Sequence, residues 1–289
     1  SHRYSDHYWA LLGWKEGRAA ASLLGRDDDA AWADANYRAL KSAVRRSLRA
    51  RMDLMEDSWI PAAAEESRFD AGSVALLFWP CEETDLVEPH ERQSSLDAFY
   101  EDFLARSQPG GEGVAPADEA ALLVPLAAMG RGDYAREVLY SLLDRRHPLG
   151  WNAWARGRGA ELRQPGAVGD MPDLRAAAAY VIGARGLAAR ENGKKLDLFC
   201  GAPAEWLQHG DGFRIYGMPT AFGPLDLAGF WRKQQFLVDV GGGARPPGGF
   251  RVWWPRQVRP DRVSVNGKRV ESFDAQGCDL PHDFQGRLE

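Results

Sequence analysis

The sequence predicts a mainly α-helical protein, a run of helical hairpins followed by a small antiparallel β-module. Two observations predict this fold class. Apolar residues recur at a spacing near 3.6 through about the first 190 residues, which is typical of amphipathic helices. After Lys195 the spacing changes to 2, in short runs separated by Gly and Pro, which is typical of strands. We therefore expect a helical portion over residues 1–194 and a β-sandwich-like module over residues 195–289.

A helical hairpin is predicted at the start of the chain. Apolar residues at helical spacing favour a helix over residues 8–24, and Gly25 then supplies a C-terminal stop. Residues 27–29 are three aspartates, whose negative charge favours the N-terminus of the next helix. A second apolar pattern continues to residue 52, so the two helices are expected to pack antiparallel.

Four further helices follow from the same spacing. Gly130-Arg131-Gly132 separates two of them, and Asn192-Gly193 is typical of a helix C-cap. The helices are predicted over residues 94–106, 117–129, 133–145 and 171–191. Residues 53–91 and 147–170 then remain as long loops, and long loops in a compact domain are usually functional.

The β-module is predicted as five short runs. Its clearest signal is Asn266-Gly267 between alternating residues, which indicates a tight hairpin. The runs cover residues 196–200, 213–216, 236–240, 250–254 and 263–270.

Charge and hydropathy exclude several classes of protein. The net charge of −5 comes from 41 acidic and 36 basic side chains with the two signs interleaved, so the chain has no basic stripe for a nucleic acid. No apolar run approaches the roughly 18–20 residues that span a bilayer, so no membrane partner is expected. The first residues lack a signal-peptide pattern. The compartment stays open between the cytoplasm and, after signal removal, the periplasm or exterior.

The sequence gives no support for a metal or an organic cofactor. Cys81, Cys200 and Cys278 are far apart, with no C-x-x-C spacing, and are interpreted as ordinary thiols. Gly241-Gly242-Gly243 lies between predicted strands and indicates a turn and not a phosphate-binding loop.

Aromatic composition points toward a sugar ligand. The chain has 11 Trp against 8 Tyr, and Trp151-Asn152-Ala153-Trp154-Ala155-Arg156 combines two indole rings with amide and guanidinium donors. The flat C–H faces of a pyranose stack on such rings, and its hydroxyl groups pair with the polar groups. The alternative is packing of the helical hairpins, in which aromatic residues dominate burial.

Two aspartates in the long loops have two interpretations each. Asp70 either binds a sugar hydroxyl or forms an Asx-turn or helix cap. Asp170 either binds a ligand or acts as an N-cap with Pro172 in the first helical turn.

Hydrolysis of a glycosidic bond requires two carboxyl groups that face each other across the sugar. The candidates in this chain are Asp6, Asp70, Glu119 and Asp170. Taken alone, each is better explained as a surface or capping carboxylate, because Asp and Glu are abundant and spacing in the sequence cannot pair them.

The order of several segments resembles bacterial six-hairpin glycosidases of the (α/α)6-toroid type. The first is Tyr4-Ser5-Asp6-His7-Tyr8-Trp9-Ala10-Leu11-Leu12-Gly13, which is similar to the family's Tyr-Trp-Asp-Asp-Phe helix start. The others are Phe69-Asp70-Ala71, Trp151-Asn152-Ala153-Trp154-Ala155, Gly169-Asp170-Met171-Pro172, Gly201-Ala202-Pro203-Ala204-Glu205-Trp206-Leu207, Pro219-Thr220-Ala221-Phe222-Gly223 and Val265-Asn266-Gly267-Lys268.

The resemblance implies a partial toroid that acts on an oligo- or polysaccharide by inversion. It assigns catalysis to Glu119 and Asp6. It assigns sugar binding to Trp9, Asp70, Trp151, Asn152, Trp154, Arg156 and Asp170. A closed toroid of six hairpins has about twelve helices and the sequence predicts roughly half of them, so we expect an N-terminal portion or another chain to complete it.

Departures from the family pattern fall at the end of the helical toroid where its loops are expected to hold substrate, here called the rim. Arg156 stands where the family usually has Glu, which exchanges an acid or base for a fixed cation. Asp173 stands where a His is common, and His7 replaces the second Asp of the first motif. These changes motivate an alternative function, a catalytically inactive relative that binds glycan or serves as a structural partner.

Overall fold

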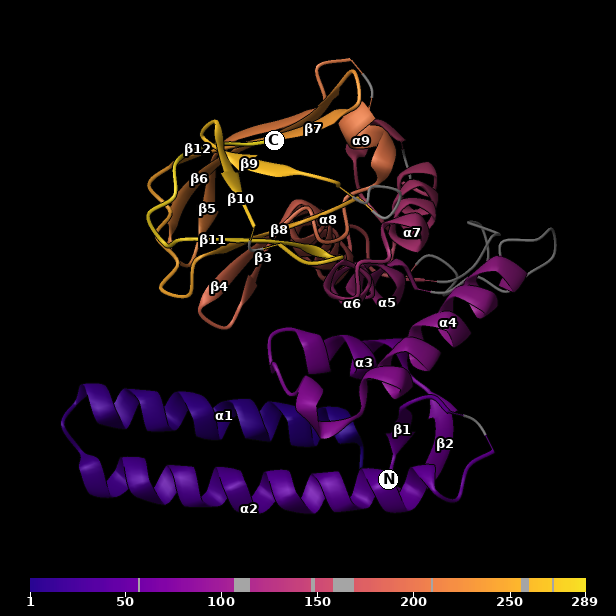
Figure 1. Ribbon diagram of the computed structural model, residues 1–289. Helices are drawn as coiled ribbons and strands as arrows, with labels where there is room; N and C mark the ends of the chain where they lie inside the picture. Colours follow the sequence, from indigo (N-terminus) through magenta and orange to yellow (C-terminus); the bar gives the residue numbers. More distant parts are fainter. Residues whose placement is uncertain are drawn as a thin grey trace. The chain divides into compact units, whose positions relative to one another are not determined.

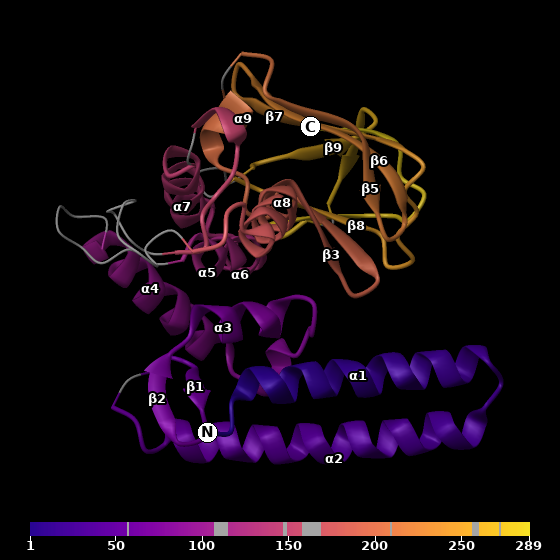
Figure 2. The same cartoon turned by 180° about the vertical axis from the view of Figure 1, so that it is seen from behind.

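The computed structural model describes residues 1–56, 58–106, 115–146, 149–157, 169–208, 210–255, 260–271 and 273–289. The chain forms two compact units, drawn in Figures 1 and 2. The first unit comprises Ser1–Pro125 and Ala153–Ala176, and the second comprises Leu126–Asn152 and Ala177–Glu289. The division into a helical and a β domain at residue 194 stays a prediction.

The first unit begins with the predicted antiparallel hairpin of α1 (Tyr4–Leu23) and α2 (Asp27–Met52), the two long helices that lie side by side in Figure 1. Gly25 adopts φ +67° in the connection, the left-handed conformation that glycine adopts without steric cost. The helix start at Tyr4 precedes the predicted residue 8. Tyr4, Tyr8 and Leu11 lie on one face of α1 at spacings of four and three residues, and this face is buried.

A buried carboxylate, that of Glu83, contacts both helices of this hairpin. Glu83 is fully buried, and its two oxygens lie 3.0 Å from Lys15 Nζ and 2.9 Å from Lys41 Nζ. Tyr37 also donates its hydroxyl hydrogen to Glu83, at 3.1 Å. Because Lys15 is on α1 and Lys41 on α2, one carboxylate fixes both helices.

The same network extends to Asp85 and makes the stability of the first unit depend on acid pH. Burial alone raises the pKa of Asp85, but the hydrogen bond from Lys41, at 2.8 Å, and the Lys41 and Arg45 charges lower it overall. A lowered folded-state pKa stabilises the fold above the unfolded pKa of about 3.9, and this stabilisation is lost as the pH falls further. We expect Asp85→Asn to flatten the loss of unfolding free energy below about pH 4. Unfolding free energies of the unmodified chain and the variant, measured at several pH values, check this. The same loss of stability in both proteins below about pH 4 would contradict it.

Residues 53–91 are not the long loop that the sequence predicts. They contain a short hairpin, β1 (Pro61–Ala63) and β2 (Glu66–Phe69), then α3 (Ala71–Phe78) and the 3-10 turn η1 (Thr84–Leu86). Five of the eight residues of α3 are buried, so its apolar run shows no helical periodicity. The prediction of a loop was wrong because a short, mostly buried and mostly apolar helix lacks an amphipathic pattern.

The predicted later helices are present in the predicted order with shifted bounds, as α4 (Pro89–Arg106), α5 (Pro116–Ala121), α6 (Leu123–Ala128), α7 (Gly132–Asp144) and α8 (Leu174–Ala188). The 3-10 turn η2 (Leu149–Trp151) and the short helix α9 (Ala204–Gln208) were not predicted. The helix predicted over residues 117–129 is divided at Leu122. Within the described residues, no helix combines the length and the apolarity that a bilayer span requires.

The predicted end of the last long helix was wrong. The helix ends at Ala188, and Asn192-Gly193 forms the turn of a hairpin between β3 (Ala189–Asn192) and β4 (Lys195–Leu198). Gly193 has φ +56°, which suits a helix C-cap and a hairpin turn equally. The Asn-Gly pair alone therefore did not separate the two structures.

The second unit holds two sheets that share one core (Figures 1 and 2). The four-stranded sheet has the order β11-β8-β4-β3, and the six-stranded sheet has the order β10-β9-β12-β7-β6-β5. Pairing is antiparallel except between β4 and β8. The remaining strands are β5 (Phe213–Thr220), β6 (Gly223–Arg232), β7 (Gln235–Gly242), β8 (Phe250–Trp253), β9 (Val263–Val265), β10 (Lys268–Val270), β11 (Gly277–Leu280) and β12 (Gly286–Leu288).

The core explains which strand faces are apolar. Leu196, Leu198 and Val252 come from one sheet, Leu225 and Val238 from the other, and all of them belong to one buried cluster. The β9–β10 hairpin is confirmed, with Asn266 and Gly267 at positive φ in the turn. The sequence analysis missed β6, where alternate residues are buried.

Candidate functional site

Two of the predicted site residues lie on the exposed side of α1. Asp6 is in its first turn and Trp9 is three residues later, so the two occupy neighbouring positions on the helix surface. Asp6 is exposed and the Trp9 side chain is 50% exposed. A carboxylate and an indole ring are therefore both available to a ligand at this end of the hairpin.

Asp70 has the capping role that was one of its two interpretations. It is the N-cap of α3, with extended backbone angles, and its carboxylate accepts a hydrogen bond from Gly72 N at 3.2 Å. An N-cap carboxylate satisfies one of the unpaired amide groups at the start of a helix.

The capping role predicts the effect of two substitutions. Asp70→Ala is expected to lower the unfolding free energy by about 1 kcal/mol, whereas Asp70→Asn, which caps equally well, should leave it unchanged. Chemical denaturation of both variants checks this. Equal stability of the alanine and asparagine variants would contradict the assignment.

Glu119 is in the first turn of α5 and only 2% of its surface is exposed. The helix begins at Pro116, whose fixed φ favours a first helical turn. Within the first unit, α5 packs against α3, the helix that Asp70 caps. The first turn of α5 therefore holds a buried carboxyl group.

The Trp151–Trp154 segment divides its aromatic residues between surface and core. Trp151 ends η2 and is 71% exposed, whereas Trp154 is 5% exposed. Asn152 has φ +49° and accepts a hydrogen bond from the guanidinium of Arg146. Trp151 fits the predicted stacking role, and the burial of Trp154 agrees with the packing alternative.

Arg156 and Asp170 lie together in the structure. The guanidinium Nη1 is 3.1 Å from Asp170 Oδ2, and Arg156 N donates to Asp170 O at 2.9 Å. Both side chains are exposed. Asp170 does not cap the following helix: Asp173 accepts from Arg175 N, at 2.9 Å, at the start of α8, so that interpretation of Asp170 was wrong.

The structure thus brings two pairs of predicted residues together, Asp6 with Trp9 and Arg156 with Asp170. Trp151 and Asn152 belong to the second unit, and the other seven predicted residues to the first. A common cavity for Asp6, Asp70, Glu119 and Asp170 stays a prediction.

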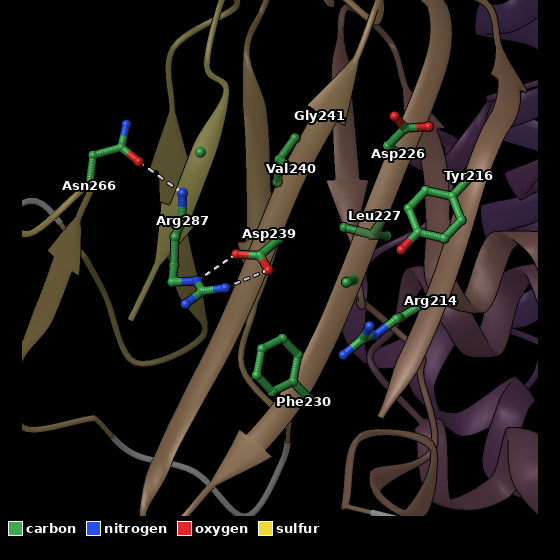
Figure 3. A pocket seen from close by; sticks show the side chains of 12 residues that line it. Arg214, Tyr216, Asp226, Leu227, Phe230, Asp239, Val240, Gly241, Asn266 and Arg287 are labelled. Atoms are coloured by element: carbon green, nitrogen blue, oxygen red, sulfur yellow. Dashed lines mark hydrogen bonds and ion pairs between the residues drawn. The ribbon is translucent and has the colours of Figure 1, made fainter. Parts of the chain in front are cut away.

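The sequence analysis missed a hollow of about 740 Å³ on the six-stranded sheet of the second unit (Figure 3). Its walls are side chains of β5, β6, β7 and β12 on the face opposite the buried cluster. Ala228 and Gly241 stand in the middle of this face, and their small size leaves the space open. Alternation of buried and partly exposed residues along β6 was the available signal, but that strand was not recognised.

Other kinds of site have less support in the described residues. Burial raises the pKa of Cys81 and of Cys200 to about 11, so neither thiol is a ready nucleophile near neutral pH. Within the described part of the chain, no three His, Cys, Asp or Glu side chains gather in a way that could hold a metal ion.

Comparison with known proteins identifies the class of fold. No protein-family model matches the chain, and no curated protein matches it. Among solved structures, the chain is similar to an alpha-L-rhamnosidase from Streptomyces avermitilis that was crystallised with L-rhamnose. The TM-score is 0.53 at 17% sequence identity, and the match covers 98% of this chain and 26% of the rhamnosidase chain.

The chain therefore spans about a quarter of the length of that protein. Nearly all of its helical portion and its β-module take part in the match. At 17% identity the likeness concerns the fold alone.

Proposed function

We propose that this chain is a glycoside hydrolase-like domain that acts on an oligo- or polysaccharide. The fold likeness to a sugar-bound rhamnosidase over 98% of the chain carries this proposal. The order of the family-like segments from Tyr4 to Lys268 supports it. Fold alone does not define an activity, so the proposed hydrolysis depends on the predicted catalytic and sugar-binding side chains.

In the catalytic form of the proposal, Glu119 and Asp6 are the two carboxyl groups. Asp6 is exposed, which suits the base that activates a water molecule, and Glu119 then protonates the leaving oxygen. An inverting pair requires a separation of roughly 6.5–9.5 Å to admit that water. Within the first unit, Trp9 offers an exposed ring to the sugar, and the polar groups of Asp70, Arg156 and Asp170 are proposed to bind its hydroxyls. Sugar binding by Trp151 and Asn152, which belong to the second unit, is proposed separately.

Additional helices are proposed to complete a toroid around the first unit. The α1–α2 hairpin exposes several large apolar side chains, namely Trp9, Leu23, Leu24 and Trp32. Large apolar side chains that are this exposed are available for contact with another protein segment. The match with only 26% of the rhamnosidase chain agrees with helices from elsewhere in the same protein or from another chain.

The second candidate is a catalytically inactive relative that binds glycan or acts as a structural partner. The ion pair between Arg156 and Asp170 favours it. Each charge neutralises the other, and Arg156 occupies the position where the resembling family usually has Glu. A guanidinium does not exchange protons near neutral pH, so this position has no acid or base.

A panel of neutral and acidic oligosaccharides tests the proposal with the full chain. Reducing ends report cleavage, calorimetry reports binding, and proton NMR of the first product reports its anomeric configuration. Cleavage with inversion supports the catalytic form, and binding without cleavage supports the second candidate. No response to any glycan would remove the catalytic form and the glycan-binding form of the second candidate, and would leave only a structural role.

A further inference from the structure

A continuous row of side chains crosses the hollow on the six-stranded sheet. The strand register places Arg214 opposite Ala228, Ala228 opposite Asp239, and Asp239 opposite Arg287. Arg214 and Asp239 are therefore two strand spacings apart, about 9–10 Å, with only the Ala228 methyl group between them. Figure 3 shows Arg214, Tyr216 and Asp226 along one side of the hollow and Asp239 and Arg287 along the other.

The groups on the Asp239 side are already paired. Arg287 makes a bidentate contact with Asp239, with Nε at 2.6 Å and Nη2 at 2.8 Å from its oxygens. Asn266 accepts a hydrogen bond from Arg287 N at 2.8 Å. These contacts fix the wall and cancel its charge, so this side presents polar atoms of fixed geometry without a free cation.

Arg214, on the other side of the hollow, has guanidinium N–H groups that are available to a ligand. Its side chain is exposed and, in the part of the chain that the structure describes, makes no hydrogen bond or ion pair. The guanidinium carbon lies 5.7 Å from the centre of the Phe230 ring, which holds it by a cation–π contact. Arg214 is thus a positioned donor fork, and such a fork matches a carboxylate in two parallel hydrogen bonds.

Tyr216 and Asp226 provide the complementary surface beside Arg214. Tyr216 is 74% exposed, so its ring is available to stack against a ligand. Asp226 accepts a hydrogen bond from Gly217 N through Oδ1, at 2.6 Å, which holds the carboxylate at the rim of the hollow. A ligand that donates hydroxyl hydrogens satisfies Asp226 and Asp239, whereas a dianionic phosphate is repelled by the carboxylate of Asp226.

We infer that this hollow is a second carbohydrate site, which binds a sugar unit bearing a carboxylate, with Arg214 on the carboxylate and Tyr216 against the ring. The inference rests on the proposed function only in taking a carbohydrate as the ligand. The site is separate from the rim residues of the first unit, since all of its lining residues belong to the second.

Two forms of one oligosaccharide test the site. Tetragalacturonate and its methyl ester differ in the free carboxylates, and calorimetry with the full chain at fixed salt measures the affinity of each. The acid form is expected to bind about tenfold more tightly than the ester. Arg214→Ala is expected to bring the two affinities within about twofold, and Tyr216→Ala to weaken both forms.

Arg232→Ala is the matched control, because Arg232 is an exposed arginine at the end of β6 that does not line the hollow. It should bind both forms as the unmodified chain does. Equal affinity for acid and ester, no binding of either form, or unchanged preference in Arg214→Ala overturns the inference. The proposed function of the first unit is tested by the neutral members of the glycan panel, so the two can fail separately.

Discussion

Glu119→Gln is expected to reduce glycan cleavage by about 10²–10⁴-fold, the usual contribution of a positioned general acid or base. The substitution preserves the size of the side chain and removes its exchangeable proton. Because Glu119 is only 2% exposed, the amide also occupies a site that excludes bulk water from taking over the proton transfer. Initial rates on the best substrate of the panel measure the effect, with glycan binding measured beside it.

Glu101→Gln is the matched control, since Glu101 is an exposed glutamate on α4. It should cleave at the original rate. Thermal unfolding of both variants separates loss of chemistry from loss of fold. A folded Glu119→Gln variant with undiminished cleavage would remove Glu119 from the mechanism, and absent cleavage in the unmodified chain with retained binding would support the inactive relative.

Glu83→Gln is expected to lower the unfolding free energy by about 3 kcal/mol, near the lower end of the effect of breaking a buried ion pair. The substitution leaves Lys15 and Lys41 facing a neutral amide. Both lysines are largely buried, with 22% and 19% of their side chains exposed, so water compensates only in part. A loss of this size corresponds to a fall of about 6–12 °C in melting temperature.

Glu16→Gln is the matched control on the same hairpin, because Glu16 is exposed on α1, one residue after Lys15. Its melting temperature should change by less than about 2 °C, as for most surface substitutions. A Glu83 variant as stable as this control would show that the buried carboxylate is dispensable. Calorimetric unfolding of the two variants at neutral pH decides between these outcomes.

Local signals predicted the parts of the fold in which local chemistry decides the structure. Gly25 ends α1, and Asn266-Gly267 turns the β9–β10 hairpin, as the residue types require. The Asn192-Gly193 turn was misassigned because its preference for positive φ suits two structures, and the pairing of β3 with β4 selects one of them. Helix α3 was missed because its short run is mostly apolar and mostly buried, which leaves no amphipathic pattern.

The site residues also divide into those that the sequence predicted and those whose contacts only the structure shows. Composition and segment order singled out Asp6, Trp9 and Trp151, and the structure leaves these side chains exposed. The sequence did not indicate that Arg156 pairs with Asp170, and it left the cap as one of two interpretations of Asp70, because both contacts depend on backbone geometry. It also left open which indole is buried, and the structure places Trp154 in the interior.

The sequence by itself determined the change from helical to strand periodicity, the turns at glycine and the balance of charge, because these depend on residues a few positions apart. Only the tertiary structure decided that Glu83 joins Lys15 and Lys41, and that Arg214 stands across Ala228 from Asp239. These residues are distant in the chain, and the pairing of helices and strands alone brings them within reach of one another.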